Sequence, residues 1–295
     1  MWNRANPAFF GCESGFAEAD TVLFGAPFDS TASYRPGSRF GSRAMREESY
    51  GIETYSPYRG ADLSECAVFD AGDPELCIGD AKLALAQIET ISAEILDAGK
   101  LPVMLGGEHL VTLGAVRRAA KQYPDLCVVQ FDAHTDLRDE YLGVSLSHAA
   151  VLRRCWDLLG DGRVFQFGIR SGLREEFEWA RAHTMLHPFG FDGLAEMVES
   201  LAGSPVYFTM DLDVLDPSVF PGTGTPEPGG VSFLQLMNAM TLVAERCRVV
   251  GCDLVELAPM LDPSGVSTVV ACKLLRELLL ALHANPNVAK KTGKC

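Results

Sequence analysis

The chain has 295 residues, 47% of them hydrophobic and 22% charged, which is an ordinary globular composition and a length that can bury a sizeable core. The formal net charge of −14 argues against nucleic acid as a partner, because phosphate binding needs a surplus of Lys and Arg, and it favours cationic ligands through long-range steering. The nine cysteines include no Cys-x-x-Cys pair, and the sequence has neither a signal peptide nor an apolar run of ~20 residues, so we expect a cytoplasmic protein without a disulfide framework or a membrane span.

Strand-like and helix-like segments alternate along almost the whole chain. Continuous apolar runs rich in β-branched and aromatic residues predict strands at residues 21–28, 66–71, 101–105, 126–131, 164–169, 206–210 and 249–255. Apolar residues at helical spacing predict helices at residues 81–95, 112–122, 148–159, 192–201, 232–247 and 264–283, the first of them ended by Gly99. Uninterrupted apolar strands are typical of a parallel sheet covered on both faces, so this order predicts a doubly wound α/β sandwich. No repeat or change of composition marks a linker, and we expect residues 1–295 to form one domain.

Carboxylate and imidazole side chains follow four of the predicted strands. In sheets of this class, functional sites form at the carboxyl ends of the strands. The candidates at these ends are His109, the motifs Asp132-x-His134-x-Asp136 and Asp211-x-Asp213, and Glu256. Alternate side chains of an extended segment point the same way, so the charged residues of each motif can converge on one point. So many carboxylates at one edge would repel each other strongly unless cations lay among them.

Each of these features alone has a structural alternative. His109, which follows Gly106 and Gly107, could be a surface residue of a tight turn, and the two Asp motifs could be capping carboxylates or turns at strand ends. Their joint occurrence favours a metal centre. A set of four Asp and two His is rich in hard oxygen donors, which suits Mn²⁺ or Mg²⁺ better than a thiolate-preferring ion. Six such ligands can bridge two ions ~3.5–4 Å apart, and a pair of ions makes hydroxide available near neutral pH.

Three further features are candidates for binding and proton transfer. Glu256 follows an apolar strand, so it is either a helix-capping surface group or a buried anion for which a cationic substrate would be the partner. His148 begins a predicted helix and is either a surface residue or a proton carrier near a hydrolytic centre. The Pro- and Gly-rich loop at residues 216–230 directly follows the second Asp motif, and this position predicts a wall of a substrate pocket rather than only a rigid surface loop.

Taken together, these motifs resemble those of the ureohydrolase family, whose members include arginase, agmatinase and guanidinobutyrase. The resemblance is carried by the segments at residues 106–109, 131–136, 210–217 and 221–230. The segments at residues 25–29 and 35–41 are similar as well, so the resemblance spans about residues 21–283, the expected catalytic core. It implies a three-layer α/β/α sandwich around a mostly parallel sheet, with two Mn²⁺ ions per subunit.

The resemblance also implies a role for each candidate residue. One ion would take His109, Asp132, Asp136 and Asp211, and the other would take His134, Asp132, Asp211 and Asp213. A hydroxide bridging the ions, oriented by Asp136, would attack the carbon of a guanidinium group, and the intermediate would collapse to urea and an amine. Glu256 would bind the guanidinium group, and Thr225 of the Pro/Gly loop would contribute to substrate binding. His148 would contact the substrate and protonate the leaving amine.

Within this family, the sequence looks most similar to agmatinases. The Ser-Gly-Asn element with which arginases read the α-carboxylate is absent from residues 137–148, and residues 35–41 and 167–171 look more like agmatinases. We therefore expect hydrolysis of agmatine to putrescine and urea, a reaction of polyamine biosynthesis, with Asp139 and Glu140 favouring the dication. The alternative is guanidinobutyrate or another ω-guanidino compound, whose far carboxylate would pair with Arg138 or Arg170. A non-catalytic relative is the least favoured interpretation. The family implies a homotrimer or homohexamer.

Overall fold

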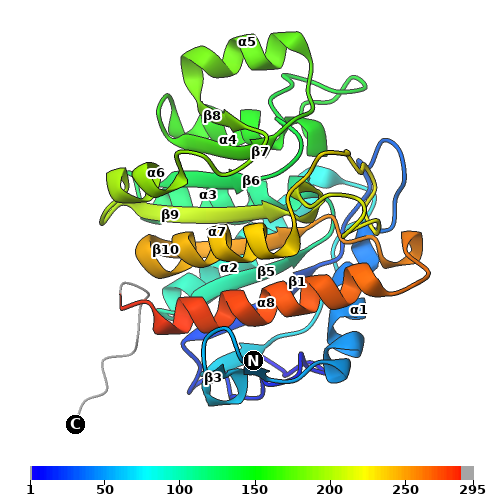
Figure 1. Cartoon of the computed structure of the whole chain (residues 1–295), viewed down its shortest axis with the longest axis vertical. Coiled ribbons are helices and arrows are strands. Elements are labelled where there is room, and N and C mark those ends of the chain that lie inside the picture. Colours follow the sequence, from blue (N-terminus) through cyan, green and yellow to red (C-terminus); the bar gives the residue numbers. More distant parts are fainter. Residues whose placement is uncertain (1, 287–295) are drawn as a thin grey trace.

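The computed structural model describes residues 2–286 and is built around an eight-stranded sheet (Figure 1). In spatial order its strands are β4 (Val68–Asp70), β1 (Thr21–Ala26), β5 (Leu101–Gly106), β10 (Arg248–Val255), β9 (Pro205–Asp211), β6 (Cys127–Phe131), β7 (Val164–Ile169) and β8 (Met185–Pro188). Every neighbouring pair in this sheet is parallel. A separate antiparallel pair is formed by β2 (Tyr55–Ser56) and β3 (Ala61–Asp62). The mostly parallel sheet predicted from the sequence is confirmed.

Helices cover both faces of the sheet. One face packs against α1 (Gly41–Glu48), α6 (Leu194–Ser200), α7 (Phe233–Arg246) and α8 (Val266–Ala284). The other face packs against α2 (Ala81–Asp97), α3 (Thr112–Gln122), α4 (Val151–Leu159) and α5 (Arg174–His183). The result is the three-layer α/β/α sandwich that the sequence predicted (Figure 1).

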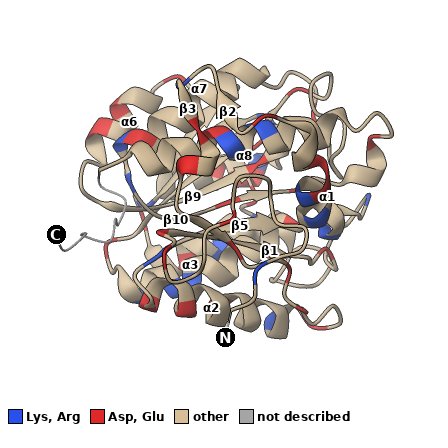
Figure 2. Cartoon of the chain, turned by 90° about the horizontal axis from the view of Figure 1, so that it is seen from below, with Lys and Arg blue, Asp and Glu red and all other residues tan. Residues whose placement is uncertain are grey.

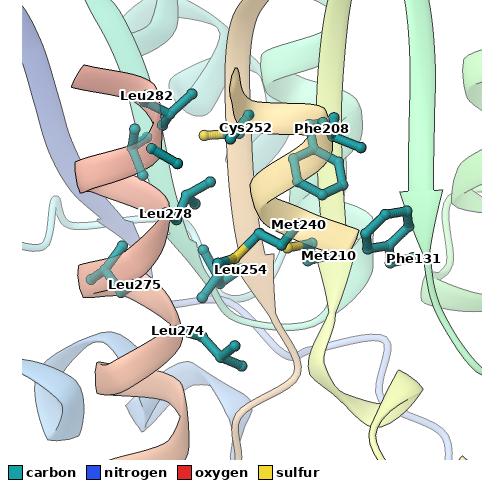
Figure 3. Packing of buried hydrophobic residues seen from close by; sticks show 14 of the residues in the cluster. Phe131, Phe208, Met210, Met240, Cys252, Leu254, Leu274, Leu275, Leu278 and Leu282 are labelled. Atoms are coloured by element: carbon teal, nitrogen blue, oxygen red, sulfur yellow. The ribbon is translucent and has the colours of Figure 1, made fainter. Parts of the chain in front are cut away.

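The core lies between the sheet and its helices. Figure 3 shows Phe208 and Met210 of β9 and Leu254 of β10 facing Met240 of α7 and Leu278 of α8. Each of these side chains is at most 2% exposed. The long strands are buried along nearly their whole length, which is why their sequences are continuously apolar rather than alternating.

The seven strands and six helices predicted from the sequence are all present, with small shifts at their ends. The helix predicted at residues 81–95 extends to Asp97, and Gly99 follows it with a positive φ of 71°. Five helices and strands were missed, namely α1, α5, the edge strand β8 and the two short strands β2 and β3 of the separate pair. Both missed helices are rich in charged residues, and β8 is only partly buried, so none of them has a strong apolar period.

The architecture brings the carboxyl ends of four central strands together. β5, β10, β9 and β6 are consecutive neighbours in the sheet, and these are the strands after which the predicted ligands and Glu256 lie. Many acidic residues instead lie on outer helices such as α6, so the net negative charge is spread well beyond this edge (Figure 2). Among residues 2–286, no helix is long and apolar enough to cross a membrane.

Candidate metal centre and substrate pocket

The first half of the site is assembled around His109. Its Nδ1 atom lies 3.0 Å from Asp132 Oδ2, 3.1 Å from Asp136 Oδ2 and 3.4 Å from Asp211 Oδ2. These side chains follow three different strands, β5, β6 and β9. The four residues predicted to hold one ion therefore direct their ligand atoms at a common point.

The second half of the site is adjacent and shares Asp132. His134 Nδ1 lies 3.0 Å from Asp213 Oδ2 and 3.6 Å from Asp132 Oδ1. The ligand atoms of Asp132, His134 and Asp213 all lie within 4.8 Å of one another, as do those of His109, Asp132 and Asp211. Asp132 belongs to both groups, which is the arrangement that a carboxylate bridging two ions requires.

The chemistry of this cluster fits a pair of divalent cations. His109 Nδ1 is buried and has no hydrogen-bond partner among the described residues, although three carboxylates surround it. Burial and the neighbouring Asp213 and Asp132 raise the pKa of Asp211 well above its usual range. Burial and Asp132 likewise raise the pKa of Asp136 to about 7. Carboxylates crowded in this way stay ionised near neutral pH only when cations compensate them, so the site can hold two metal ions.

Backbone geometry at the site is unusual at several positions. Asp136 and Glu256 have positive φ angles of 51° and 68°, which is a costly conformation for residues with a side chain and is typical of functional sites. Gly107 packs so tightly that a Cβ atom there would lie 1.9 Å from the carbonyl oxygen of Phe28. Its N–H donates to the Ala26 carbonyl at 2.9 Å, which ties the His109 turn to the end of β1.

Glu256 lies beside the cluster, as expected for a substrate-binding carboxylate. Its side chain is largely buried, and Oε1 accepts a hydrogen bond of 2.7 Å from the backbone N–H of His109. Burial and the nearby Glu108 carboxylate raise its pKa well above the usual range. A guanidinium ion would relieve this unfavourable burial of negative charge, so the side chain can receive a cation.

A cavity of about 250 Å³ opens over the cluster. The predicted site residues that line it are His109, His134, Asp136, Asp211, Glu256, Thr225 and His148. Thr225 Oγ1 lies 3.5 Å from Asp213 Oδ2, and His148 Nε2 lies 3.2 Å from Ser33 Oγ. Burial lowers the pKa of His148 to about 4, so its imidazole is neutral near pH 7. This cavity has the size and polarity for a small linear cation.

Of the residues considered for binding the far end of the substrate, the structure places only some in the wall of the cavity. Arg170 donates to five backbone carbonyls, those of Gly168, Asp213, Val214, Leu215 and Glu227, and these bonds occupy its guanidinium group. Asp139 is exposed, pairs with Arg154 at 2.7 Å and, like Glu140, is not among the residues that line the cavity. Arg138 does line it, next to Tyr141 and Glu176.

Several residues of the site were not singled out from the sequence. Glu108 is fully buried and accepts hydrogen bonds from the backbone N–H and hydroxyl of Thr31, and the Thr31 hydroxyl also accepts from the N–H of His148. Tyr141 packs edge-on against His148, with ring centroids 5.9 Å apart. Thr31 and Tyr141 lie in irregular segments that leave no periodic signal. Glu108, in contrast, stands inside a recognised motif and could have been noticed there.

The comparisons with known proteins agree with this geometry. A family model described as the arginase family matches residues 19–281. The chain belongs to the arginase family. An agmatinase from Bacillus anthracis is 48% identical over 92% of this chain and 95% of its own length. The crystal structure of an agmatine ureohydrolase from Thermoplasma volcanium is 35% identical, with a TM-score of 0.85 over 94% of each chain.

A human relative within the arginase family is named for a different substrate class. The mitochondrial guanidino acid hydrolase is 36% identical over 89% of this chain and 78% of its own length. These matches cover nearly the whole α/β/α sandwich, so they show both the family and the fold. The chain is therefore an enzyme of the ureohydrolase type with a binuclear metal site.

Proposed function

We propose that this protein is an agmatinase, which hydrolyses agmatine to putrescine and urea. The observation that carries the proposal is Glu256, a buried carboxylate at the edge of a cluster of six metal-ligand side chains. Agmatine carries a guanidinium group that such a carboxylate binds with two parallel hydrogen bonds. The 48% identity to an agmatinase over nearly the whole chain supports the same substrate.

The metal centre in this proposal holds two Mn²⁺ ions. His109, Asp132, Asp136 and Asp211 would hold one ion, and His134, Asp132, Asp211 and Asp213 would hold the other. The oxygen-rich donor set with two imidazoles favours Mn²⁺ over thiolate-preferring metals. When bound, the ions supply a hydroxide nucleophile near neutral pH and act as a Lewis acid.

The protein side chains bind the substrate and move protons. Glu256 fixes the guanidinium group above the cluster, and Thr225 also lines the cavity and contributes to substrate binding. Asp136 accepts a hydrogen bond from the nucleophile and so directs its lone pair at the guanidinium carbon. His148 accepts the proton that the nucleophile releases after it adds to the guanidinium carbon and delivers it to the leaving amine, because a neutral imidazole can accept and then donate.

A second candidate is a guanidino acid such as guanidinobutyrate. The observation that favours it is Arg138, a cation in the wall of the cavity that could pair with a carboxylate at the far end. However, Arg138 Nε lies 3.7 Å from Glu176 Oε2, and its guanidinium group stacks 4.3 Å from the centre of the Tyr141 ring. Glu176 offsets this positive charge, so agmatine remains the first choice.

A substrate panel tests the proposal. Urea release is measured from agmatine, guanidinobutyrate and arginine with the Mn²⁺-loaded protein, and agmatine should have the highest kcat/KM, with activity that rises from pH 6 to 9. The variant Glu256→Gln should keep both metal ions but lose on the order of 10²-fold or more in kcat/KM. Preference for guanidinobutyrate would establish the second candidate, and no urea from any of the three would refute both.

The proposal also covers the domain organisation, the compartment and the oligomeric state of the enzyme. Residues 1–295 form one ureohydrolase domain, the protein acts in the cytoplasm on a small cationic substrate of polyamine metabolism, and it assembles as a homotrimer or homohexamer. The cysteine pattern supports the compartment, and the resemblance to the family supports the assembly. Light scattering coupled to size exclusion measures the oligomer directly.

A further inference from the structure

A buried polar network lies behind His109. His109 Nε2 is 2.9 Å from Thr209 Oγ1, and Thr209 Oγ1 donates to Asp253 Oδ1 at 2.6 Å. Asp253 is fully buried in β10 and also accepts from Thr112 Oγ1 at 2.9 Å and from the Tyr207 hydroxyl at 2.8 Å. Neither Thr209 nor Asp253 is among the residues that line the cavity. The side-chain contact that joins this network to the predicted ligands is the one with His109.

The direction of each hydrogen bond follows from the carboxylate. An ionised carboxylate only accepts, so the single hydroxyl hydrogen of Thr209 points at Asp253. The oxygen of Thr209 then has only lone pairs left for His109, and Nε2 must carry the hydrogen of the imidazole. In a neutral imidazole this leaves Nδ1 without a hydrogen, with its lone pair directed at the three carboxylates of the first ion site.

We propose that Asp253, acting through Thr209, is a positioning residue that holds His109 in the tautomer and orientation that bind a divalent ion through Nδ1. The network is rigid because its members belong to β9, β10 and α3, which pack directly against one another. Partners of this kind raise the affinity of a histidine for its metal by fixing its tautomer and its ring plane. This inference rests on the proposed metal centre.

The variant Asp253→Asn tests the proposal with almost no change in shape. A carboxamide can donate to Thr209, which frees the Thr209 hydroxyl to donate to Nε2 and moves the imidazole hydrogen to Nδ1, the tautomer that excludes a metal. In the full chain, Mn²⁺ binding is measured by calorimetry and by the electron paramagnetic resonance signal of free Mn²⁺. We expect one of the two ions to bind about 10–100-fold more weakly and to exchange faster into a chelator.

Matched variants separate this effect from a general loss of structure. Tyr207→Phe removes another hydroxyl donor to Asp253 but leaves the path through Thr209 intact, so it should bind both ions with wild-type affinity. Thr209→Val removes the acceptor of Nε2 and should weaken the same ion as Asp253→Asn, whereas Thr209→Ser keeps the hydroxyl and should restore binding. The melting temperature of each metal-free variant reports on folding. If Asp253→Asn fails to fold, the comparison of Thr209→Val with Thr209→Ser still tests the positioning role.

The outcomes distinguish this inference from the proposed function. Wild-type protein that binds no Mn²⁺ would refute the metal centre itself. Wild-type protein that binds two ions, together with Asp253→Asn and Thr209→Val variants that bind both within twofold of wild type, would overturn only the positioning role. If Tyr207→Phe weakened Mn²⁺ binding as much as Asp253→Asn, the positioning role would also be overturned. The effect would then belong to the whole buried polar network rather than to the path through Thr209.

Discussion

At the residue scale, the histidines of the site differ in the state that their surroundings favour. Burial lowers the pKa of His109, but the carboxylates of Asp132, Asp136 and Asp211 around Nδ1 outweigh it and raise that pKa well above the usual value. His148 lies among hydroxyl groups and aromatic side chains instead, and burial lowers its pKa to about 4. The carboxylates around His109 favour a positive charge at Nδ1, which a metal ion bound to a neutral imidazole would supply in place of a proton. The surroundings of His148 instead favour a neutral group that exchanges protons.

Replacement of His148 by Asn gives a testable consequence of this difference. Loss of a general acid typically costs 10²–10⁴-fold in rate, so kcat should fall by roughly that factor. A histidine with a pKa of about 4 is already neutral at pH 6, so the ratio of wild-type to variant kcat should stay constant between pH 6 and 9. Rate profiles of both proteins measure this ratio. A ratio that changes with a midpoint near pH 6.5 would contradict the assignment.

For single residues, the sequence could predict some contacts of the site but not others. Spacing predicted that Asp132, His134 and Asp136 would converge, on the premise of an extended segment. The structure brings them to one cluster, although β6 ends at Phe131 and Asp136 has a positive φ of 51°. The partner of His109 could not be predicted in this way. Thr209 and Asp253 belong to neighbouring strands that are distant in sequence, and only their register brings them together. Asp253, a charge inside an otherwise apolar strand, was the one available signal.

At the element scale, the turn after β5 determines where His109 lies. Gly107 packs against the carbonyl groups of β1 and of the segment after it, and its own carbonyl accepts from the N–H of Glu256 at 2.9 Å. The turn therefore links β5 to both β1 and β10. A glycine is needed at position 107 because backbone approaches backbone there, and at position 106 because the Val255 side chain leaves no room for a Cβ atom.

The variant Gly107→Ala tests this role. A methyl group 1.9 Å from the Phe28 carbonyl oxygen forces the turn to move, which should destabilise the protein by about 1–3 kcal/mol. The displaced turn should also carry His109 away from the carboxylates and weaken Mn²⁺ binding. Calorimetric unfolding and a metal titration measure the two effects. Gly143→Ala is a useful control, because Gly143 has a positive φ of 82° but open space around it, so only backbone strain should result.

The strengths and gaps of sequence-based prediction are clearest for whole elements. The central strands β5, β9 and β10 are continuously buried, so composition alone identifies them. The edge strand β8 is half-exposed and contains a proline, and α5 is stabilised at its start by the Glu176 side chain, which accepts from the N–H of Leu173. Local capping and edge position are properties of the folded chain, and apolar periodicity does not report them.

At the scale of the whole molecule, metal and fold should stabilise each other. The cluster joins β5, β6 and β9, so ions bound there link the central strands of the sheet. A ligand present at 100 times its Kd stabilises a fold by about 2.7 kcal/mol, which for a protein of this size raises the Tm by roughly 5 °C or more. Differential scanning calorimetry before and after chelation should show this shift. In Asp132→Asn, which lacks a shared ligand, the chelator should leave the Tm unchanged.

The division of the site between strands and loops has an evolutionary consequence. The six predicted metal ligands lie at or just after the ends of β5, β6 and β9, and all of them except His134 are buried. The cavity walls farther from the metals, around Ser33, Arg138 and Tyr141, come from irregular segments near the surface. Mutations in these segments can change which molecule is accepted without altering the hydrolytic centre. New substrate preferences can therefore arise on this scaffold by loop exchange alone, while the reaction chemistry is inherited unchanged.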